Sequence, residues 1–290
     1  GEADGRATIG GVIAANISGP RRITAGAARD HLLGFAAVSG RGEYFVAGAK
    51  VVKNVTGYDL PKLACGSWGR LMALCEVTLK VMPAPRVSET LAINGLDPQR
   101  AQRAMARALG SRAGVAAAAH FPAGMIAAHG LTVLRIEGTA PSVAARSALL
   151  AQVLADDGPV EPGDPGCWRM LKTLAPLGLE APLWRLSVPA RSSAAVGEAI
   201  ERAGGRWLAD WGGGLMWASV AGGSTASRDA AERAGGHAML VRGSPQLRAA
   251  LPTFHPQPPG LAALEQRVSR AFDPAGVFET GRFGNESHAH

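Results

Sequence analysis

The 290-residue chain is poor in cysteine, aromatic residues and charge, and each shortage excludes a class of protein. Its three cysteines, Cys65, Cys75 and Cys167, are odd in number and contain no Cys-x-x-Cys pair, which argues against a disulfide framework and a cysteine-ligated iron–sulfur cluster. Only 18% of the residues are charged, yet no apolar run approaches the roughly 20 residues that a membrane-spanning helix needs. The sequence therefore predicts a protein of the reducing cytoplasm, and the apolar share of 47% suffices for a large core.

Basic residues outnumber acidic ones, but their distribution does not predict a nucleic-acid-binding protein. The net charge is +7 and the pI is about 9.9. The 30 Lys and Arg residues are scattered and form no basic run of about 5 to 8 residues. Two tyrosines and seven phenylalanines leave little from which to build a base-stacking platform. We therefore expect no nucleic acid among the partners.

Two segments gather small residues where backbone can lie against a ligand. Residues 8–19 read TIGGVIAANISG, and residues 53–69 read KNVTGYDLPKLACGSWG. The adjacent Gly10 and Gly11 have no Cβ atoms, so we expect the main chain to turn there and a flat, phosphate-bearing molecule to come close. The alternative interpretation is a pair of glycine-rich turns between buried strands, because isolated glycine clusters are frequent false positives.

The order of these motifs is similar to that of flavoproteins of the vanillyl-alcohol oxidase type, with an FAD-binding domain of the PCMH type. That family, which also contains D-lactate dehydrogenases and glycolate oxidase subunits, has a Thr-Val/Ile-Gly-Gly-x-x-Ala-x-Asn-x-x-Gly segment. An Arg-Asp-x-x-x-Gly step follows, here Arg29, Asp30 and Gly34, and then a Gly-Tyr-Asp-Leu-x-Lys-Leu-x-x-Gly-Ser-x-Gly motif, here residues 57–69. Trp68, where larger catalytic subunits carry Glu, and the preceding stretch 53–56 resemble the smaller, FAD-binding subunits of glycolate oxidase.

The resemblance implies FAD as the cofactor and no metal. The residues that it implies as FAD contacts are Thr8, Ile9, Gly10, Gly11, Ala15, Asn16, Gly19, Arg29, Asp30, Gly57, Tyr58, Gly66, Ser67, Gly69, Leu74 and Arg282. Relatives place a first flavin-binding lobe, with the loop that cradles the FAD diphosphate, before the first motif. Only seven residues precede it here, so we expect a truncated chain that lacks this lobe.

The predicted fold class is α+β, with a break at Pro83 and Pro85. Residues 1–85 are expected to form the second lobe of the FAD domain, with strands at 31–39, 43–47 and 71–81 and a helix at 59–65 that Asp59 caps. In the third strand, Val77, Leu79 and Val81 are expected to be buried.

Residues 86–290 are expected to form a cap domain with a helix at 261–272 that returns to the FAD domain. Strands are expected at 87–93, 115–121, 131–137, 183–189, 206–210, 215–220 and 237–241, with helices at 98–109, 141–155, 192–203 and 225–234. These are two similar β-α-β-β-α rounds, which predict a ferredoxin-like cap.

No catalytic base can be identified in the sequence. Catalytic relatives carry a His-x-Gly-Asp-Gly-x-x-His segment on the cap, whereas the seven histidines here are isolated and His129-Gly130 is the nearest remnant. Arg70, Met72 and Cys75 stand where relatives commonly have Thr, Gly and Thr. A Met in place of Gly overpacks the site at a cost of about 1–3 kcal/mol, so we expect either loosely held FAD or a shifted strand.

Tyr58 permits two interpretations. The one we favour packs its ring under the flavin lobe, with the hydroxyl satisfying a buried backbone group. The other places the ring and Gly57 against the cofactor, at the start of the helix that Asp59 caps.

The sequence as a whole predicts an FAD-binding subunit of a glycolate oxidase-like complex that oxidises glycolate to glyoxylate, in an accessory or electron-relaying role. The resemblance implies a larger catalytic flavin subunit and an iron–sulfur subunit as partners, and a small 2-hydroxy acid as the substrate of the complex. It implies a cytoplasmic location, with attachment to the inner face of the membrane through the complex as an option. Two alternatives stay open: an independent FAD-dependent 2-hydroxy-acid dehydrogenase, and a non-catalytic assembly subunit that has lost FAD.

Overall fold

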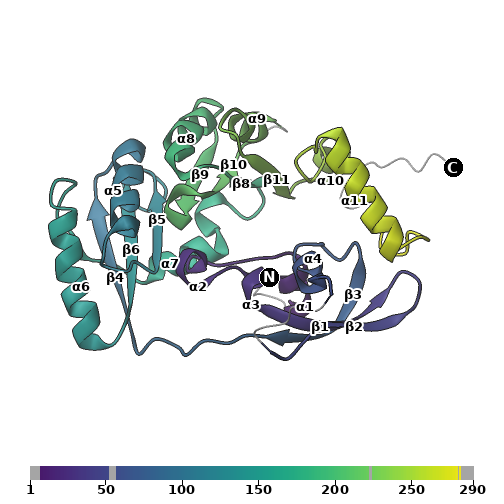
Figure 1. Cartoon of the computed structure of the whole chain (residues 1–290). Coiled ribbons are helices and arrows are strands. Elements are labelled where there is room, and N and C mark those ends of the chain that lie inside the picture. Colours follow the sequence, from purple (N-terminus) through teal and green to yellow (C-terminus); the bar gives the residue numbers. More distant parts are fainter. Residues whose placement is uncertain (1–6, 52–56, 222–223, 280, 282–290) are drawn as a thin grey trace. The chain divides into compact units, whose positions relative to one another are not determined.

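The computed structural model describes residues 7–51, 57–221, 224–279 and 281, which form two compact units (Figure 1). Unit 1 comprises residues 1–19, 25–83 and 256–282, and unit 2 comprises residues 20–24, 84–255 and 283–290. Each unit has its own hydrophobic core. The assignment of residues 1–85 to a flavin lobe and of residues 86–290 to a cap stays a prediction.

Unit 1 contains a three-stranded antiparallel sheet of order β2-β1-β3. Its strands are β1 (Leu32–Ser39), β2 (Tyr44–Gly48) and β3 (Met72–Leu79). The helices of residues 7–83 and of the C-terminal segment are α1 (Ile9–Ala14), α2 (Arg22–Ala25), α3 (Ala28–His31), α4 (Leu60–Ala64) and α11 (Pro259–Phe272). Buried side chains of α1, β1, α4 and β3 form the core of this unit. Asp59 caps α4 as predicted, because its Oδ1 accepts a hydrogen bond from the Lys62 amide.

Helix α11, which the amphipathic pattern of residues 261–272 predicts, packs on the sheet of unit 1. The Phe45 ring lies 5.8 Å from the ring of Phe35 and 6.2 Å from that of Phe272, between centroids. The Gly40 amide donates to the Phe272 carbonyl at 2.9 Å. A Cβ on Gly40 would lie 2.1 Å from Asp273 Oδ1, so the close approach of α11 requires glycine at this position.

Two expectations for unit 1 are wrong. Gly10 and Gly11 lie inside α1 with ordinary negative φ, not in a turn, because Thr8 caps a helix there. Val81 is 86% exposed, not buried, because β3 ends two residues earlier, at Leu79.

Unit 2 is built on one eight-stranded antiparallel sheet of order β11-β8-β10-β9-β5-β6-β4-β7. The strands are β4 (Val87–Asn94), β5 (Ala117–Phe121), β6 (Leu131–Gly138), β7 (Glu161–Pro162), β8 (Leu183–Ser187), β9 (Arg206–Asp210), β10 (Leu215–Ser219) and β11 (His237–Arg242). The helices are α5 (Pro98–Gly110), α6 (Ala140–Val153), α7 (Gly166–Thr173), α8 (Ser193–Arg202), α9 (Ala226–Arg233) and α10 (Pro245–Ala250).

The sheet consists of two ferredoxin-like halves. In the second half, the order β11-β8-β10-β9 places the first strand between the fourth and the third, and the first half repeats this order as β7-β4-β6-β5. The halves join where β5 pairs with β9, at His120 opposite Ala209. The ferredoxin-like arrangement predicted from the two rounds is therefore confirmed, with a short fourth strand in the first half.

The alternation of side chains along the strands assigns the helices to the two faces of this sheet. Leu134 of β6 packs with α5 and α6, while Met216 of β10 packs with α8 and α9. The opposite face, here called the α7 face, is covered by Trp168 and Leu171 of α7. Strand register places these residues on the α7 face: Val133, Arg135, Leu208, Asp210, Trp217, Arg185 and Met239.

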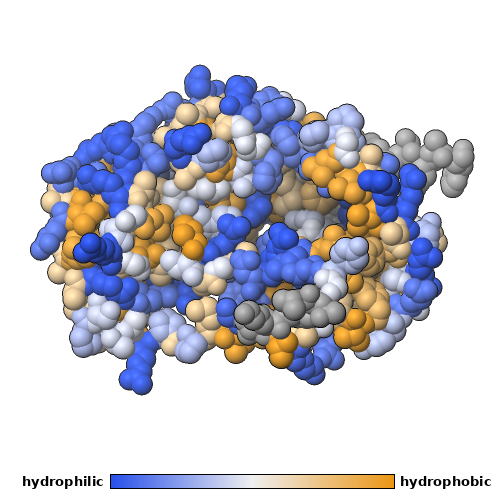
Figure 2. All heavy atoms as spheres, viewed as in Figure 1, coloured by the Kyte–Doolittle hydropathy of each residue, from blue (hydrophilic) through white to orange (hydrophobic). Residues whose placement is uncertain are grey.

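The surface shown in Figure 2 is mostly hydrophilic, with apolar side chains in separate patches. Among the helices of the described ranges, none combines the length and the apolar character needed to cross a bilayer. Exposed apolar side chains of unit 1 include Ile9, Ile17 and Tyr58, at 55%, 60% and 94% exposure. All three lie in the two segments that the sequence singles out.

Candidate functional site

Asn16 joins the segments that the sequence predicts to act together in unit 1. Its Oδ1 accepts from the Arg29 amide at 3.2 Å and from the Cys65 thiol at 3.5 Å. Burial raises the pKa of that thiol, so Cys65 keeps the proton that it donates. Asn16 has φ of +49°, a left-handed conformation that Asn tolerates better than most residues. One side chain therefore ties the end of α1 to α3 and to the end of α4.

The turn of residues 66–69 docks on the end of α1. Gly66, Trp68 and Gly69 have φ of +93°, +58° and +74°, so the turn needs the left-handed region repeatedly. The Gly66 amide donates to Ile13 O at 3.2 Å, and the Trp68 amide donates to Ala14 O at 2.8 Å. The backbones of the two predicted segments are thus in direct contact.

Helix α1 presents backbone and small residues at its start. Thr8 Oγ1 accepts from the Gly11 amide at 3.0 Å. A Cβ on Gly10 would lie 3.6 Å from Leu74 Cβ, which is an ordinary contact, and Gly11 is exposed. A Cβ on Gly11 would lie 3.3 Å from the Thr8 Oγ1 that caps the helix, which is a tight contact. Gly10 therefore tolerates an added Cβ beside β3, whereas Gly11 does so only if the Thr8 cap shifts slightly.

Tyr58 does not pack under the lobe, and the interpretation that we favoured from the sequence is wrong. Its side chain is 94% exposed because it stands just before the helix that Asp59 caps. Lys62, one turn on, donates through Nζ to the Arg29 carbonyl at 2.6 Å, which fixes α4 against α3. The interpretation in which Tyr58 contacts a cofactor stays a prediction.

Other predicted residues have local roles. Asp30 Oδ2 accepts from the Ala27 amide at 2.8 Å at the start of α3. Ser67 donates its amide to Ala64 O at 3.2 Å in the turn after α4. Gly57 has φ of +79° and Gly19 ordinary negative φ. Arg282 and the stretch 53–56 lie outside the described residues.

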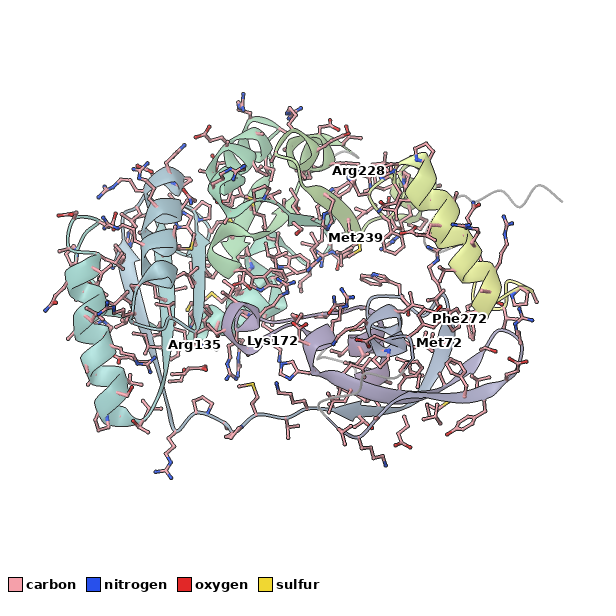
Figure 3. All side chains as sticks on the ribbon, in the orientation of Figure 1. Met72, Arg135, Lys172, Arg228, Met239 and Phe272 are labelled. Atoms are coloured by element: carbon pink, nitrogen blue, oxygen red, sulfur yellow. The ribbon has the colours of Figure 1, made fainter. Side chains whose placement is uncertain are left out.

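The three residues that depart from the family pattern lie in different surroundings. Met72 is 2% exposed and packs in the core of unit 1 (labelled in Figure 3), so its side chain does not occupy the outer surface of α1. Arg70 pairs with Glu279 at 3.4 Å, and Cys75 is exposed on β3. The pairing of β3 with β1 shifts register between Ala36 and Ala37, so that Cys75 has no partner in β1. The expectation of either loosely held FAD or a shifted strand stays a prediction.

Unit 2 carries a second concentration of polar side chains, on the α7 face. Glu137 pairs with Arg21 at 2.9 Å and lies 3.9 Å from Arg135, whose guanidinium stacks 4.4 Å from the centroid of Trp168. Asp210 is 3% exposed, and burial raises its pKa to about 7, although the Trp211 amide donates to its Oδ1 at 2.7 Å. This buried carboxyl changes its protonation near neutral pH.

Two arginines contact Trp211, which follows Asp210 in the chain. The Cζ atoms of Arg22 and Arg185 are 4.4 Å and 5.5 Å from the centroid of its ring. Sequence reasoning missed Arg22, Arg185 and Asp210, because they are far apart in the chain. The sheet register brings Arg185 and Asp210 to one face, and Arg22 reaches Trp211 from α2. The one signal was Trp211 itself, a large residue beside three glycines.

Among the described histidines, the rings of His237 and His255 lie 6.5 Å apart between centroids, whereas His120 and His129 make separate contacts. Burial lowers the pKa of His120 to about 4, so its ring is neutral, and its Nδ1 lies 3.0 Å from Thr132 Oγ1. His129 contacts Asn94 through Nε2 at 3.2 Å. Within the part of the chain that the structure describes, no group of three His, Cys, Asp or Glu side chains is placed to hold a metal ion.

Comparisons with known proteins place the chain among flavoproteins. No protein-family model matches it. It is 32% identical over 279 residues to the glycolate oxidase subunit GlcE of Escherichia coli (strain K12), an alignment that covers 95% of this chain and 71% of that protein. It is 39% identical over 84 residues to the glycolate oxidase subunit GlcD of Bacillus subtilis (strain 168), covering 29% of this chain and 18% of that protein.

A solved structure with a similar fold is the VAO-type flavoprotein MtVAO615 from Myceliophthora thermophila C1. It matches with a TM-score of 0.59 at 16% identity, over 93% of this chain and 59% of that chain. At this identity the match shows the fold alone, and it agrees with the predicted PCMH-type flavoprotein fold.

Proposed function

Because the chain belongs to the family of the glycolate oxidase subunit GlcE, we propose that it is the FAD-binding subunit of a glycolate oxidase-like complex that oxidises glycolate to glyoxylate. Its role in the complex is accessory or electron-relaying. The similarity to GlcE extends over 95% of the chain, whereas the similarity to GlcD extends over 29%. This difference favours the accessory subunit over an independent dehydrogenase.

The observation that carries the proposal is the junction at Asn16 in unit 1. It brings α1, α3 and the turn of residues 66–69 together by hydrogen bonds to Arg29 and Cys65 and between the backbones. The two segments that meet there also carry the exposed apolar side chains of Ile9, Ile17 and Tyr58. A surface of small residues beside exposed apolar ones fits a flat, partly apolar cofactor, because binding would remove that apolar area from water.

The residues of this chain would hold and orient FAD. FAD supplies a ring that accepts two electrons, which is the chemistry that oxidation of a 2-hydroxy acid needs. Gly10 and Gly11 leave room for the cofactor beside α1, the turn of residues 66–69 shapes the neighbouring wall, and Tyr58 offers an exposed ring to cover it. The remaining FAD contacts named from the sequence belong to this proposal as well.

The proposal includes the other members of the complex and its place in the cell. A larger flavin subunit oxidises the substrate, and an iron–sulfur subunit receives the electrons. The complex works in the cytoplasm or at the inner face of the membrane. The similarity to two different glycolate oxidase subunits supports an assembly of several chains.

The visible absorption spectrum of the purified protein tests the flavin assignment. We expect flavin bands, and heat denaturation should release FAD that chromatography identifies. A folded protein that lacks flavin and does not take up added FAD would instead support the alternative of an assembly subunit that has lost the cofactor.

A further inference from the structure

Two arginines of unit 2 meet at one indole ring. Residues 20–24 are held to this unit by Thr24, whose Oγ1 donates to Ala116 O at 3.1 Å, and by the ion pair of Arg21 with Glu137. This attachment places the Arg22 guanidinium 4.4 Å from the Trp211 centroid, while Arg185 reaches the same ring from β8 at 5.5 Å. Trp211 is 8% exposed, so its ring is a fixed support for both guanidiniums.

These two arginines differ from the neighbouring arginines because they have no carboxylate partner among the described residues. Arg21 and Arg135 share Glu137, at 2.9 Å and 3.9 Å. For Arg22 and Arg185, the described residues provide no ion pair and no side-chain hydrogen bond. Asp210 is a weak counter-charge for them, because burial raises its pKa to about 7 and the charged side chain that acts on it is Arg135.

Arg22 and Arg185 lie close enough for their like charges to act on each other. Burial lowers the pKa of the Arg185 guanidinium, and the charge of Arg22 lowers it further. Burial also lowers the pKa of His237, and Arg185 and then His255 lower it further. In the sheet, His237 pairs with Ser187, two residues along β8 from Arg185. His237 is therefore neutral near pH 7, and the like charges at this end of the α7 face are the two guanidiniums, whose mutual repulsion a bound anion would relieve.

We propose that Arg22 and Arg185, supported by Trp211, bind the carboxylate of a small 2-hydroxy acid or of the 2-oxo acid formed from it. A guanidinium presents a planar fork of N–H groups that matches a carboxylate in a bidentate pair, and stacking on an indole fixes the plane of that fork. Next to Arg185 in the sheet stand Trp217 on β10 and Met239 on β11 (labelled in Figure 3). These apolar neighbours suit a ligand with a small carbon skeleton.

The anion chemistry rests on unit 2 alone, whereas the choice of a 2-hydroxy acid rests on the proposed function. The competing explanation is structural: both arginines could serve only to stack on Trp211 and stabilise the fold. In that case their substitution would change the stability of unit 2 and leave the affinity for small acids unaltered.

Calorimetric titration of the purified chain with glycolate, at low ionic strength, tests the proposal. Matched titrations use glyoxylate, inorganic phosphate and the uncharged amide of glycolic acid. The variants are Arg22→Met and Arg185→Met, which keep an apolar stem and remove the charge. Arg233→Met is the control, because Arg233 is exposed on α9, which covers the opposite face of the sheet.

We expect glycolate and glyoxylate to bind, the amide not to bind, and each of the two variants to lose about tenfold or more in affinity while the control does not. Arg185→Lys, which keeps the charge and loses the fork, should lie between wild type and Arg185→Met. If a methionine variant does not fold, Arg185→Lys and the matched titrations of the wild-type chain still test the proposal. Equal binding of glycolate by Arg185→Met, binding of the amide as tightly as glycolate, or binding of phosphate without glycolate would overturn the proposal.

Flavin content measured on the same samples separates this inference from the proposed function. Glycolate binding by a chain without flavin would remove the proposed cofactor role and leave the anion site in place. A flavin-loaded chain that binds glycolate independently of Arg22 and Arg185 would support the proposed cofactor role and rule out the anion site.

Discussion

Substitutions of Gly10 test whether a glycine is needed there for folding or for FAD binding. An added Cβ would meet Leu74 Cβ at 3.6 Å, so Gly10→Ala should fold normally and retain FAD. Gly10→Val carries two further methyl groups across the surface where FAD is expected, and we predict that it loses most of its flavin. The ratio of flavin to protein measures this, and the circular dichroism spectrum reports whether the rest of the chain stays folded. Full flavin content in Gly10→Val would remove α1 from the cofactor site.

Two substitutions of Tyr58 distinguish the role of its aromatic ring from the role of its hydroxyl group. Because the side chain is 94% exposed, Tyr58→Phe should change the free energy of unfolding by less than about 0.5 kcal/mol, as surface substitutions usually do. Tyr58→Ala should leave the stability of the apoprotein equally unaffected but weaken FAD binding, because it removes the ring that would cover the cofactor. Denaturant unfolding and FAD titration of the apoprotein measure the two effects. A stability loss of 1–3 kcal/mol in Tyr58→Phe, about the cost of an unpaired buried group, would mean that the hydroxyl is buried in solution.

Asp210 should make the stability of the protein depend on pH. Burial raises its pKa from 3.8 to about 7, so between these values the folded chain binds a proton that the unfolded chain has released. The protonated Asp210 side chain therefore contributes its full stability at low pH, and this contribution declines as the pH rises from 3.8 to about 7. The full effect is about 4 kcal/mol, since each pKa unit corresponds to about 1.4 kcal/mol.

Asp210→Asn isolates this effect, because the amide oxygen can still accept from Trp211 and cannot ionise. Between pH 4.5 and pH 8 the variant should gain stability relative to wild type. Denaturant unfolding at both values measures the difference, and the opposite contribution of His120, whose pKa is lowered to about 4, cancels in the comparison. Equal pH dependence in both proteins would show that Asp210 is hydrated and ionised in the fold.

Among the elements, α11 depends on a single glycine in the hairpin of unit 1. A Cβ on Gly40 would lie 2.1 Å from Asp273 Oδ1 and 2.7 Å from Asp273 Cα, so Gly40→Ala must push the end of α11 away. We expect a loss of about 1–3 kcal/mol, as overpacking usually causes, and faster hydrogen exchange in α11. Gly260→Ala, in the same helix with no atom near the added Cβ, should be neutral or slightly stabilising. Equal behaviour of the two variants would show that the hairpin does not hold α11.

Element by element, periodicity predicted the long helices and strands and missed the short ones. Helix α5 was expected at 98–109 and spans Pro98–Gly110, because Asp97 caps it and its alanines recur on one face. Helix α1 was missed because two glycines hide a six-residue helix that depends on the Thr8 cap and on packing against β3. Helix α7 is amphipathic but only eight residues long, and its buried side chains Cys167, Trp168 and Leu171 pack on the sheet beneath it.

At the scale of the whole molecule, contacts between distant residues could not be read from local patterns. The two ferredoxin-like halves were predicted from their repeated order, but the pairing of His120 with Ala209 that joins them was not. Asn16 and Arg29 were predicted, through the family resemblance, to contact the same cofactor. The hydrogen bonds that join Asn16 to Arg29 and to Cys65 were not predicted, since nothing in the spacing of these residues requires them. Arg22 and Arg185 meet at Trp211 for the same non-local reason, and the resemblance gave no indication of them.

The activity of the isolated chain decides between an accessory subunit and an independent dehydrogenase. Oxidation of glycolate needs a base for the hydroxyl proton as well as a cation for the carboxylate. The sequence has no His-x-Gly-Asp-Gly-x-x-His segment of the kind expected of a catalytic subunit. We therefore predict that the purified, FAD-loaded chain does not reduce a dye when glycolate is added, and that the larger catalytic subunit restores the reaction. Arg185→Met should leave the flavin content of the chain unchanged, which serves as the loading control. Sustained dye reduction by the chain alone would establish the independent dehydrogenase, and Asp210, whose pKa lies near 7, would then be the first candidate for its base.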